Sequence, residues 1–371
     1  MARVHLQNGL GVFFLALLLV LPFQGTRPFM GRDENRYPEV AYEMLQSGDY
    51  LVPHFKGRIH LTKPPLTYWA IAASYKLLGV SPWGARLPNA LAFAFTTLFV
   101  FLMGKELFGK DAGYLAALLY MGTLVPFAAA NIVTTDTLLV MWESAALWTF
   151  LRGIKEGRKR WFLLMWLFWA LAFLTKGTAI LPVAAGAFLF WFINRKRFFS
   201  PFYGPGILLF LALGLSWYLY IWIHIPGALN TFWVEQIYGR IFSDVFHRNS
   251  KWYAPFYLYL PLLTLGAFPV SWLWVKNISR FSWQAFKKAF CQKWEISYLT
   301  YQFGVPLVVF CLAKSRLPLY ILPLYIPLAL SGAQIWLTHP SQRFEKFLWF
   351  WFIFLLILKM FSVFYCQKLS F

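Results

Sequence analysis

The chain alternates between long apolar runs and short polar segments, and the apolar runs have the length of membrane-crossing helices. A helix needs about 20 apolar residues to cross the hydrocarbon core of a bilayer. Helices are the expected form, because every backbone polar group inside a bilayer must find its hydrogen bond within the protein. The pattern predicts about eleven such helices, at residues 8–25, 86–107, 112–130, 133–152, 160–175, 177–193, 203–224, 255–276, 296–313, 317–337 and 346–366.

Two polar segments are much longer than the turns between these runs. Residues 26–85 form the longest stretch in the N-terminal half, and residues 225–254 form a second large one. Within the first, apolar residues recur at helical spacing over 37–46 and over 66–78. Both helices are too short to cross a membrane, so we expect them to lie along its interface. The sequence thus predicts an all-α polytopic protein, with one transmembrane domain over residues 1–371 and no soluble C-terminal domain.

Composition agrees with a membrane protein. The chain is 13% charged, against about 25% in a typical soluble domain, and its mean hydropathy is +0.56. Its net charge of +20 does not indicate a nucleic-acid partner. The lysines and arginines lie in short loops between apolar runs, where they set topology and contact anionic lipid head groups. We therefore expect membrane lipids, and no nucleic acid, among the partners.

The basic loops also predict an orientation. Residues 152–160, 195–197 and 276–293 are strongly basic and alternate with poorly charged turns, which is the positive-inside pattern if these three loops are cytoplasmic. Segments 26–85 and 225–254 then lie outside. The same outer side receives a set of charged residues that would not sort this way without a function: Asp33, Glu34, Lys63, Asp136, Lys176, Arg240, Lys314 and Arg316.

Asp33 and Glu34 are adjacent acids in a chain that has few acids, and Arg32 and Arg36 flank them. One interpretation is that they are helix N-terminal acids, which the helix macrodipole favours. The other is that one carboxylate faces a membrane-level cavity as a base or a positioning group. The neighbouring arginines would keep that carboxylate ionised.

A second acid, Asp136, lies at the outer mouth of the predicted span 133–152. A carboxylate within an apolar helix is costly and indicates a functional site by default. An N-cap explains this position equally well, because Thr134, Thr135 and Asp136 are all capping residues. Glu143, two turns deeper, is a further candidate acid for which the sequence names no partner.

Several cations fall at the depth of lipid head groups on the outer side. Lys63 precedes two prolines that stiffen its backbone, and a phosphate is the natural anion for it; the less favoured alternative is a snorkelling interfacial lysine. Lys314 and Arg316, with Tyr320, lie at the outer end of another span, and Arg240 lies in the second large segment. Such a cluster suits a phosphate or pyrophosphate carried on a lipid.

Metal or disulfide chemistry has little support. Cys291, Cys311 and Cys366 are far apart, and the histidines of the outer side show no pair at ligand spacing. We expect no cofactor; a divalent metal is possible but the sequence does not support one.

Several short motifs occur in the order that a known family has. They are Arg32-Asp33-Glu34-Asn35-Arg36-Tyr37, Lys63-Pro64-Pro65-Leu66-Thr67-Tyr68-Trp69, Arg86-Leu87-Pro88, Leu174-Thr175-Lys176-Gly177, Phe232-Trp233-Val234-Glu235 with Arg240, and Leu317-Pro318-Leu319-Tyr320-Ile321-Leu322-Pro323. Together they resemble the bacterial aminoarabinose transferases that modify lipid A. Those enzymes belong with the protein O-mannosyltransferases to the GT-C glycosyltransferases. The resemblance runs from about residue 30 to 330.

The resemblance implies a GT-C type bundle and an inverting glycosyltransferase. A sugar would pass from a polyprenyl-phosphate carrier to lipid A or another cell-envelope glycolipid or protein, on the periplasmic side of the bacterial inner membrane. Asp33 would be the essential carboxylate, with Glu34 as its alternative and Asp136 as a second acid. The donor phosphate would be held by these residues: Lys63, Arg240, Tyr320, Arg36, Arg316 and Lys314.

The chain departs from the family at two positions that bear on a metal. Members often have Glu directly before the Lys-Pro motif, where this chain has Thr62, and some have His where Val234 stands. Both departures favour a metal-independent site.

A transporter or flippase for an anionic lipid or sugar phosphate is the competing interpretation. Transporters tend to place ionisable groups near the midplane of related repeats, whereas here they gather at one face and no repeat is evident. A non-catalytic assembly subunit would leave the one-sided charges unexplained.

Overall fold

The structure is a computed structural model that describes residues 9–230, 232 and 248–369, without the side chains of residues 32, 33, 229 and 362–369. From the N-terminus the elements are α1 (Gly9–Val20), α2 (Gly31–Ser47), β1 (His54–Phe55), β2 (Arg58–Ile59), α3 (Leu66–Leu78), α4 (Pro82–Phe108), α5 (Lys110–Gly122), α6 (Leu124–Ala130) and α7 (Thr135–Glu156). They are followed by α8 (Lys159–Lys176), η1 (Gly177–Ile180), α9 (Leu181–Ile193), α10 (Gly204–Gly214), α11 (Ser216–His224), α12 (Ala228–Asn230), α14 (Ala254–Thr264) and α15 (Val270–Asn277). The C-terminal part holds η3 (Ile278–Arg280), α16 (Trp283–Gln292), α17 (Trp294–Leu312), η4 (Pro318–Leu324), α18 (Tyr325–Thr338) and α19 (Gln342–Leu369).

The chain is a multi-pass helical membrane protein, as the sequence predicts. Among the described residues, five helical stretches are long and apolar enough to cross a membrane, and a sixth counts if the bent pair α5 and α6 is one span. The five are Pro82–Phe108, Lys159–Ile193, Gly204–His224, Trp294–Leu312 and Pro318–Thr338. The all-α class is confirmed, and the number of eleven helices stays a prediction.

The stretch Lys159–Ile193 folds back on itself at Gly177. The rings of Trp166 in α8 and Phe188 in α9 stack with their centroids 5.8 Å apart. A continuous helix would separate these two positions by about 33 Å, at 1.5 Å per residue. The two helices are therefore antiparallel, which agrees with separate predicted spans at 160–175 and 177–193.

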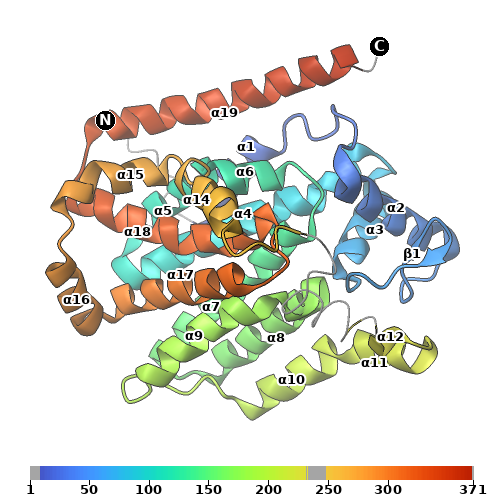
Figure 1. Ribbon diagram of the computed structural model, residues 1–371, viewed down its shortest axis with the longest axis horizontal. Helices are drawn as coiled ribbons and strands as arrows, with labels where there is room; N and C mark the ends of the chain where they lie inside the picture. Colours follow the sequence, from blue (N-terminus) through green and yellow to red (C-terminus); the bar gives the residue numbers. More distant parts are fainter. Residues whose placement is uncertain (1–8, 231, 233–247, 370–371) are drawn as a thin grey trace.

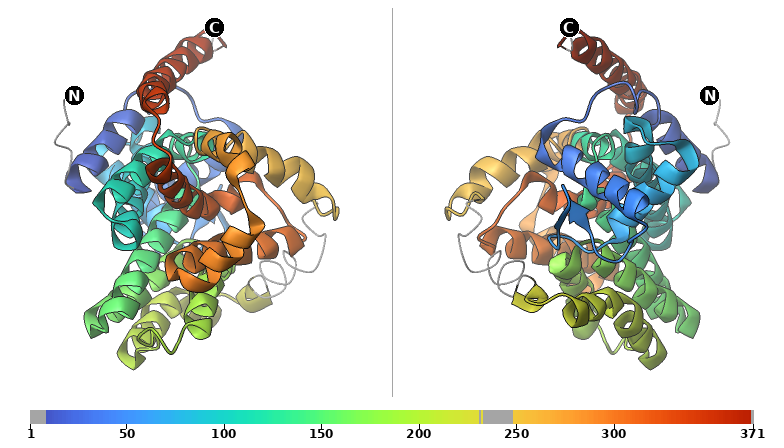
Figure 2. Two further views of the ribbon diagram at one scale, coloured as in Figure 1. Left: turned by 90° about the vertical axis from the view of Figure 1, so that its left-hand side faces the viewer. Right: turned by 90° about the vertical axis from the view of Figure 1, so that its right-hand side faces the viewer.

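The centre of the bundle is formed by α4, α5 and α7, and small residues allow the helices to approach closely. A Cβ on Gly104 of α4 would lie 2.7 Å from the Cα of Gly113 in α5. Close approach through small residues is the usual way for helices to associate where lipid removes the hydrophobic driving force. In both views of Figure 2, α19 lies along the outside of this bundle.

The predicted outer segment 26–85 is ordered. It holds α2, the antiparallel pair β1 and β2, and α3, whose bounds match the predicted 66–78. α2 begins at Gly31 rather than at residue 37, because the carboxylate of Glu34 accepts a hydrogen bond (2.9 Å) from the backbone N–H of Met30, the N-cap residue.

The predicted outer and cytoplasmic segments lie far apart. In Figure 1, α2, α3 and β1 lie at one end of the long axis, and α16, from the basic segment 276–293, lies at the other. The arrangement of the helices agrees with the orientation that the basic loops predict.

Candidate active site

A cavity of about 500 Å³ lies where the segment before α3 meets the ends of α7, α8, α11 and α17 and the turn η4. Three residues that the sequence selects from distant segments line it together: Lys63, Asp136 and Tyr320. Lys176, which the sequence places on the same side, lines it too. Most of the remaining wall is apolar, with Phe173, Leu219, Trp222 and Phe310 among its residues. The cavity thus combines a small polar cluster with a large apolar surface.

Asp136 and Lys176 form an ion pair at the edge of this cavity. The side chains are 13% and 5% exposed, and the ammonium of Lys176 donates a hydrogen bond to Oδ1 of Asp136. The hydroxyl of Thr134 donates to Oδ2 of the same carboxylate (3.1 Å) and accepts from the backbone N–H of Asp136 (3.2 Å). Thr134 is therefore the N-cap of α7, which leaves the Asp136 carboxylate to pair with Lys176.

Lys176 is placed by the chain reversal that follows it. Gly177 has φ +62°, a conformation that residues with a side chain rarely adopt, and a Cβ there would lie 2.7 Å from the hydroxyl of Tyr218. The reversal sends the ammonium of Lys176 over the ring of Tyr320, 4.5 Å from its centroid. The buried cation therefore contacts both a carboxylate and an aromatic face.

Lys63 lines the cavity from the segment that leads into α3. Its side chain is buried, and it precedes Pro64 and Pro65, after which α3 begins. Thr62 also lines the cavity, and its hydroxyl is 2.7 Å from Nε2 of His60. The position where family members often have Glu is thus occupied by a hydroxyl that pairs with histidine.

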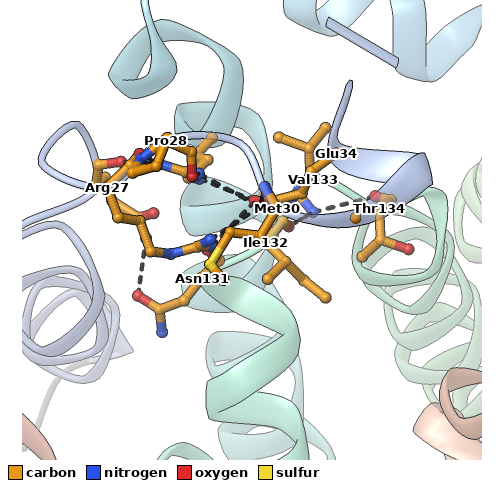
Figure 3. A network of polar contacts seen from close by, with 12 residues as sticks. Arg27, Pro28, Met30, Glu34, Asn131, Ile132, Val133 and Thr134 are labelled. Atoms are coloured by element: carbon orange, nitrogen blue, oxygen red, sulfur yellow. Dashed lines mark hydrogen bonds and ion pairs between the residues drawn. The ribbon is translucent and has the colours of Figure 1, made fainter. Parts of the chain in front are cut away.

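Glu34 does not line the cavity but lies at the centre of a buried polar network (Figure 3). Its carboxylate, 3% exposed, receives hydrogen bonds from Arg27 (2.9 and 3.0 Å) and from Nε of Arg86 (3.0 Å). The backbone N–H groups of Met30 (2.9 Å) and Val133 (3.1 Å) also donate to it. The interpretation of Glu34 as a catalytic alternative is therefore corrected, because all of these bonds would be lost if it faced a substrate.

The same network holds the loop that leads into α7. Arg27 donates to the backbone carbonyl of Asn131 (2.5 Å), and Asn89 of α4 donates to the carbonyls of Ile132 (2.7 Å) and Thr134 (3.1 Å). Because Asp33 immediately precedes Glu34, the network fixes the backbone of both candidate acids, Asp33 and Asp136. Sequence analysis missed this role, although Arg86 inside an apolar helix required a partner.

The charge of Glu34 is set by two opposing effects. Burial raises its pKa, but the hydrogen bonds from Arg86, Arg27 and the backbone N–H of Met30 outweigh burial, so that the pKa lies below its ordinary value. The carboxylate is therefore ionised at neutral pH and the network keeps its ion pairs.

This lowered pKa predicts how stability depends on pH. The stabilisation from Glu34 is fully present above the ordinary glutamate pKa of about 4.3 and is lost as pH falls through the lower pKa of the folded state. Each unit by which folding lowers the pKa corresponds to about 1.4 kcal/mol. Thermal unfolding of the detergent-solubilised protein should therefore change little from this source between pH 7 and pH 5 and fall more steeply below about pH 4.

The variant Glu34→Gln is the control for that measurement. The Gln side chain cannot titrate, so the variant should lose less thermal stability below about pH 4 than the unaltered chain does. An identical acid profile in both proteins would show that Glu34 does not control the transition.

Arg36 and Lys314 are two further predicted phosphate ligands. Arg36 stacks on the ring of its neighbour Tyr37, with the guanidinium carbon 5.1 Å from the ring centroid. Lys314 is exposed. Neither is among the residues that line the cavity.

The guanidinium of Arg316 binds backbone carbonyl groups. It donates to the carbonyls of Cys311 (2.7 and 3.2 Å), Asn249 (2.7 Å) and Lys251 (2.9 Å). It thus ties the segment before α14 to the turn that carries Tyr320, and we correct its predicted role from phosphate binding to this structural one. Its neighbour Ser315 instead lines the cavity.

Three sequence predictions fall outside the described part of the chain. The side chain of Asp33 is among them, although its backbone lies in the first turn of α2. Arg240 and Val234 lie in the segment 233–247, which is half of the second large outer segment, 225–254.

Glu143 is completely buried in α7, one turn further in than Leu139 and Val140, which line the cavity. Neither of its carboxyl oxygens has a hydrogen-bond partner among the described residues. Within that part of the chain there is also no group of three His, Cys, Asp or Glu side chains placed to hold a metal ion. Metal independence stays a prediction.

The sequence is similar to that of known transferases. Residues 62–221 match the family model described as dolichyl-phosphate-mannose-protein mannosyltransferase. The undecaprenyl phosphate-alpha-4-amino-4-deoxy-L-arabinose arabinosyl transferase of Edwardsiella ictaluri is 32% identical over 87% of this chain and 59% of its own length. The protein of the same name from Aeromonas hydrophila is 33% identical over 87% of this chain and 58% of its own length. The chain thus spans about three fifths of the length of these curated relatives.

Solved structures share the fold. ArnT from Cupriavidus metallidurans, bound to undecaprenyl phosphate, superposes with a TM-score of 0.77 at 22% identity, covering 91% of this chain and 61% of that one. The archaeal oligosaccharyltransferase AglB from Archaeoglobus fulgidus gives 0.52 at 13% identity, covering 98% and 55%. The predicted GT-C type of fold is therefore confirmed.

Proposed function

We propose that this chain, which is similar in sequence to the aminoarabinose transferases and has the GT-C type of fold, transfers a sugar from a polyprenyl-phosphate carrier. The acceptor is lipid A or another glycolipid or protein of the cell envelope. One observation carries the proposal: Lys63, Lys176 and Tyr320, from three distant segments, line the same largely apolar cavity. Such a cavity matches a phosphate group attached to a long isoprenoid chain.

The reaction is a single displacement at the anomeric carbon. The acceptor oxygen forms a bond to that carbon while the bond to the carrier phosphate breaks, so the configuration inverts and the electron pair leaves with the phosphate. Lys63 and Tyr320 offset the charge that develops on the phosphate, and preorganised groups of this kind often supply the largest catalytic effect. By resemblance, Arg240 completes this phosphate site.

The role of Asp33 depends on the acceptor. If a hydroxyl attacks, Asp33 acts as general base and takes its proton. If a phosphate of lipid A attacks, the nucleophile is already anionic, and Asp33 orients the acceptor or the sugar instead.

Asp136 keeps the ammonium of Lys176 in place. The ion pair directs Lys176 toward the ring of Tyr320, so that Tyr320 lies beside a fixed cation. Asp136 is thus a positioning residue rather than a second base.

The site faces the periplasm of a bacterial inner membrane and works without a metal. Support for the orientation comes from the basic loops 152–160, 195–197 and 276–293, which belong on the cytoplasmic side. Support for metal independence comes from Thr62, which stands where relatives often have a carboxylate.

A transporter remains the alternative class, but the related proteins are named transferases. The test is mass spectrometry of lipid A and other envelope lipids from cells with and without the protein. A mass shift equal to one transferred sugar supports the proposal and identifies that sugar. Purified protein in vesicles that moves a polyprenyl-phosphate-sugar across the bilayer, without any acceptor product, would show a transporter.

Replacing Lys63 by Gln should weaken donor binding. Losing one charge-assisted hydrogen bond costs about 1.5–3 kcal/mol, or roughly 10- to 150-fold in affinity. The measurement is binding of a fluorescent polyprenyl phosphate to the protein in nanodiscs.

Lys76→Gln removes the same charge from an exposed position on α3, in the same predicted outer segment but outside the cavity lining. Its donor affinity should stay within about twofold of the unaltered chain. An equal loss in both variants would contradict a specific contact at Lys63 and indicate general attraction between the protein and the phosphate.

A further inference from the structure

A basic, aromatic helix lies at the end of the molecule away from the candidate active site. α16 occupies one end of the long axis in Figure 1, and α2 and α3 lie at the other. The helix and its flanks carry five cations and no acid between residues 276 and 293. These cations are Lys276, Arg280, Lys287, Lys288 and Lys293.

The aromatic residues of this segment form a chain of ring contacts that ends on α17. Phe286 lies at its centre, 6.1 Å from Phe281, 5.5 Å from Trp283 and 6.3 Å from Phe290, measured between ring centroids. Phe290 in turn contacts Tyr301 of α17 at 5.8 Å. The helix is therefore fixed to the bundle by one end of the chain of rings, while Phe281 and Trp283 stay exposed.

The polar and apolar faces of α16 are well separated. Trp283, Phe286 and Phe290 follow helical spacing on one face, and Lys288 lies on the other. Lys287 lies at the boundary, where its ammonium is 5.4 Å from the ring centroid of Trp283, which is itself 58% exposed. This is the side-chain order of a helix at a membrane interface, with rings toward the hydrocarbon and ammonium groups among the head groups.

We propose that α16 and its flanking cations form a binding site for anionic phospholipid head groups, in the leaflet opposite the candidate active site. Charge complementarity identifies the occupant, since five cations with no acid between residues 276 and 293 favour an anionic partner. The exposed rings favour a lipid over a soluble acidic protein, because the hydrocarbon of the same leaflet covers them. The neighbouring α15 presents Trp274 and Val275 outward beside this segment, so α16 is held next to lipid-facing surface.

A natural cysteine on α16 provides a site for a spectroscopic label. Cys291, near the C-terminal end of this helix, is exposed. With Cys311 and Cys366 replaced by Ser, a nitroxide attached at Cys291 reports whether this position contacts lipid or water. The full-length chain is reconstituted in nanodiscs of phosphatidylcholine alone, or of an equal mixture with phosphatidylglycerol.

In the mixture, we expect the nitroxide to be less accessible to a water-soluble relaxation agent than in phosphatidylcholine. Native mass spectrometry of the protein released from the same nanodiscs should show that it retains more phosphatidylglycerol than phosphatidylcholine. Replacing Lys287 and Lys288 together by Gln should lower that retention, by roughly fivefold for each lysine removed.

The matched control is the pair Lys196→Gln and Arg197→Gln, which removes two exposed cations from another predicted cytoplasmic loop. It should leave the signal at Cys291 unchanged and retention nearly so. An equal loss in both pairs would overturn the proposal in favour of a diffuse charge effect. A label that is equally water-accessible in both lipid compositions would also overturn it, and would instead leave this face open to a soluble partner.

Discussion

Replacing Asp33 by Asn is expected to abolish sugar transfer while the protein still inserts into the membrane and binds the polyprenyl-phosphate donor. The substitution keeps the size of the side chain but removes its negative charge and its ability to accept a proton. Removal of a general base typically costs about 10²- to 10⁴-fold in rate. The measurement is the mass of the acceptor after incubation with donor, together with donor binding in nanodiscs.

Glu39→Gln is the matched control for this prediction. Glu39 is an exposed acid on the same helix, α2, and the substitution is equally conservative. It should leave transfer unchanged. Full acceptor conversion by the Asp33→Asn protein would contradict the role of Asp33 as the essential carboxylate. Loss of donor binding would mean that the carboxylate organises the donor site instead.

The pH profile separates the two roles of Asp33. A general base gives a rate that falls on the acid side as the carboxylate is protonated, and Asp33→Asn would remove that limb along with most of the activity. If Asp33 only orients an anionic acceptor, the Asp33→Asn protein should keep some activity. That activity should fall at low pH as the acceptor phosphate, rather than Asp33, is protonated. The two outcomes therefore also identify the acceptor as a hydroxyl or a phosphate.

Sequence periodicity was sufficient to predict the helices whose ends are marked locally. α3 has its predicted bounds because prolines precede it and Gly79 ends it. α2 begins earlier than predicted because its first turn depends on Glu34, whose partners Arg86 and Val133 are distant in sequence. Local pattern carries no information about such partners.

The same limit applies to the candidate site. Lys63, Asp136 and Tyr320 were found because each departs from its apolar surroundings, and the structure brings them to one cavity. Periodicity alone did not separate Glu34 from Asp33. Arg316 looked like a phosphate ligand, because a sequence shows that an arginine is present but not that backbone carbonyls satisfy its guanidinium.

Breaking the ion pair between Asp136 and Lys176 should produce the largest loss of stability. Asp136→Asn leaves the ammonium of Lys176 buried without its counter-charge. Lys176→Met likewise leaves the carboxylate of Asp136 buried without a cation. Removing one partner of a buried pair typically costs about 3–5 kcal/mol. Retention of monodisperse protein after heating in detergent measures this loss for each single variant.

The double variant, Asp136→Asn with Lys176→Met, decides whether the pair only stabilises the fold or also serves transfer. It buries no uncompensated charge, so most of the lost stability should return, as it does when buried pairs are replaced together. Transfer should not return, because no cation then lies against the ring of Tyr320, where Lys176 is 4.5 Å from the centroid. If stability and transfer recover in parallel, the pair acts only on the fold. If the double variant is no more stable than the two single variants, Asp136 and Lys176 contribute through other contacts, and the positioning role assigned to Asp136 is lost.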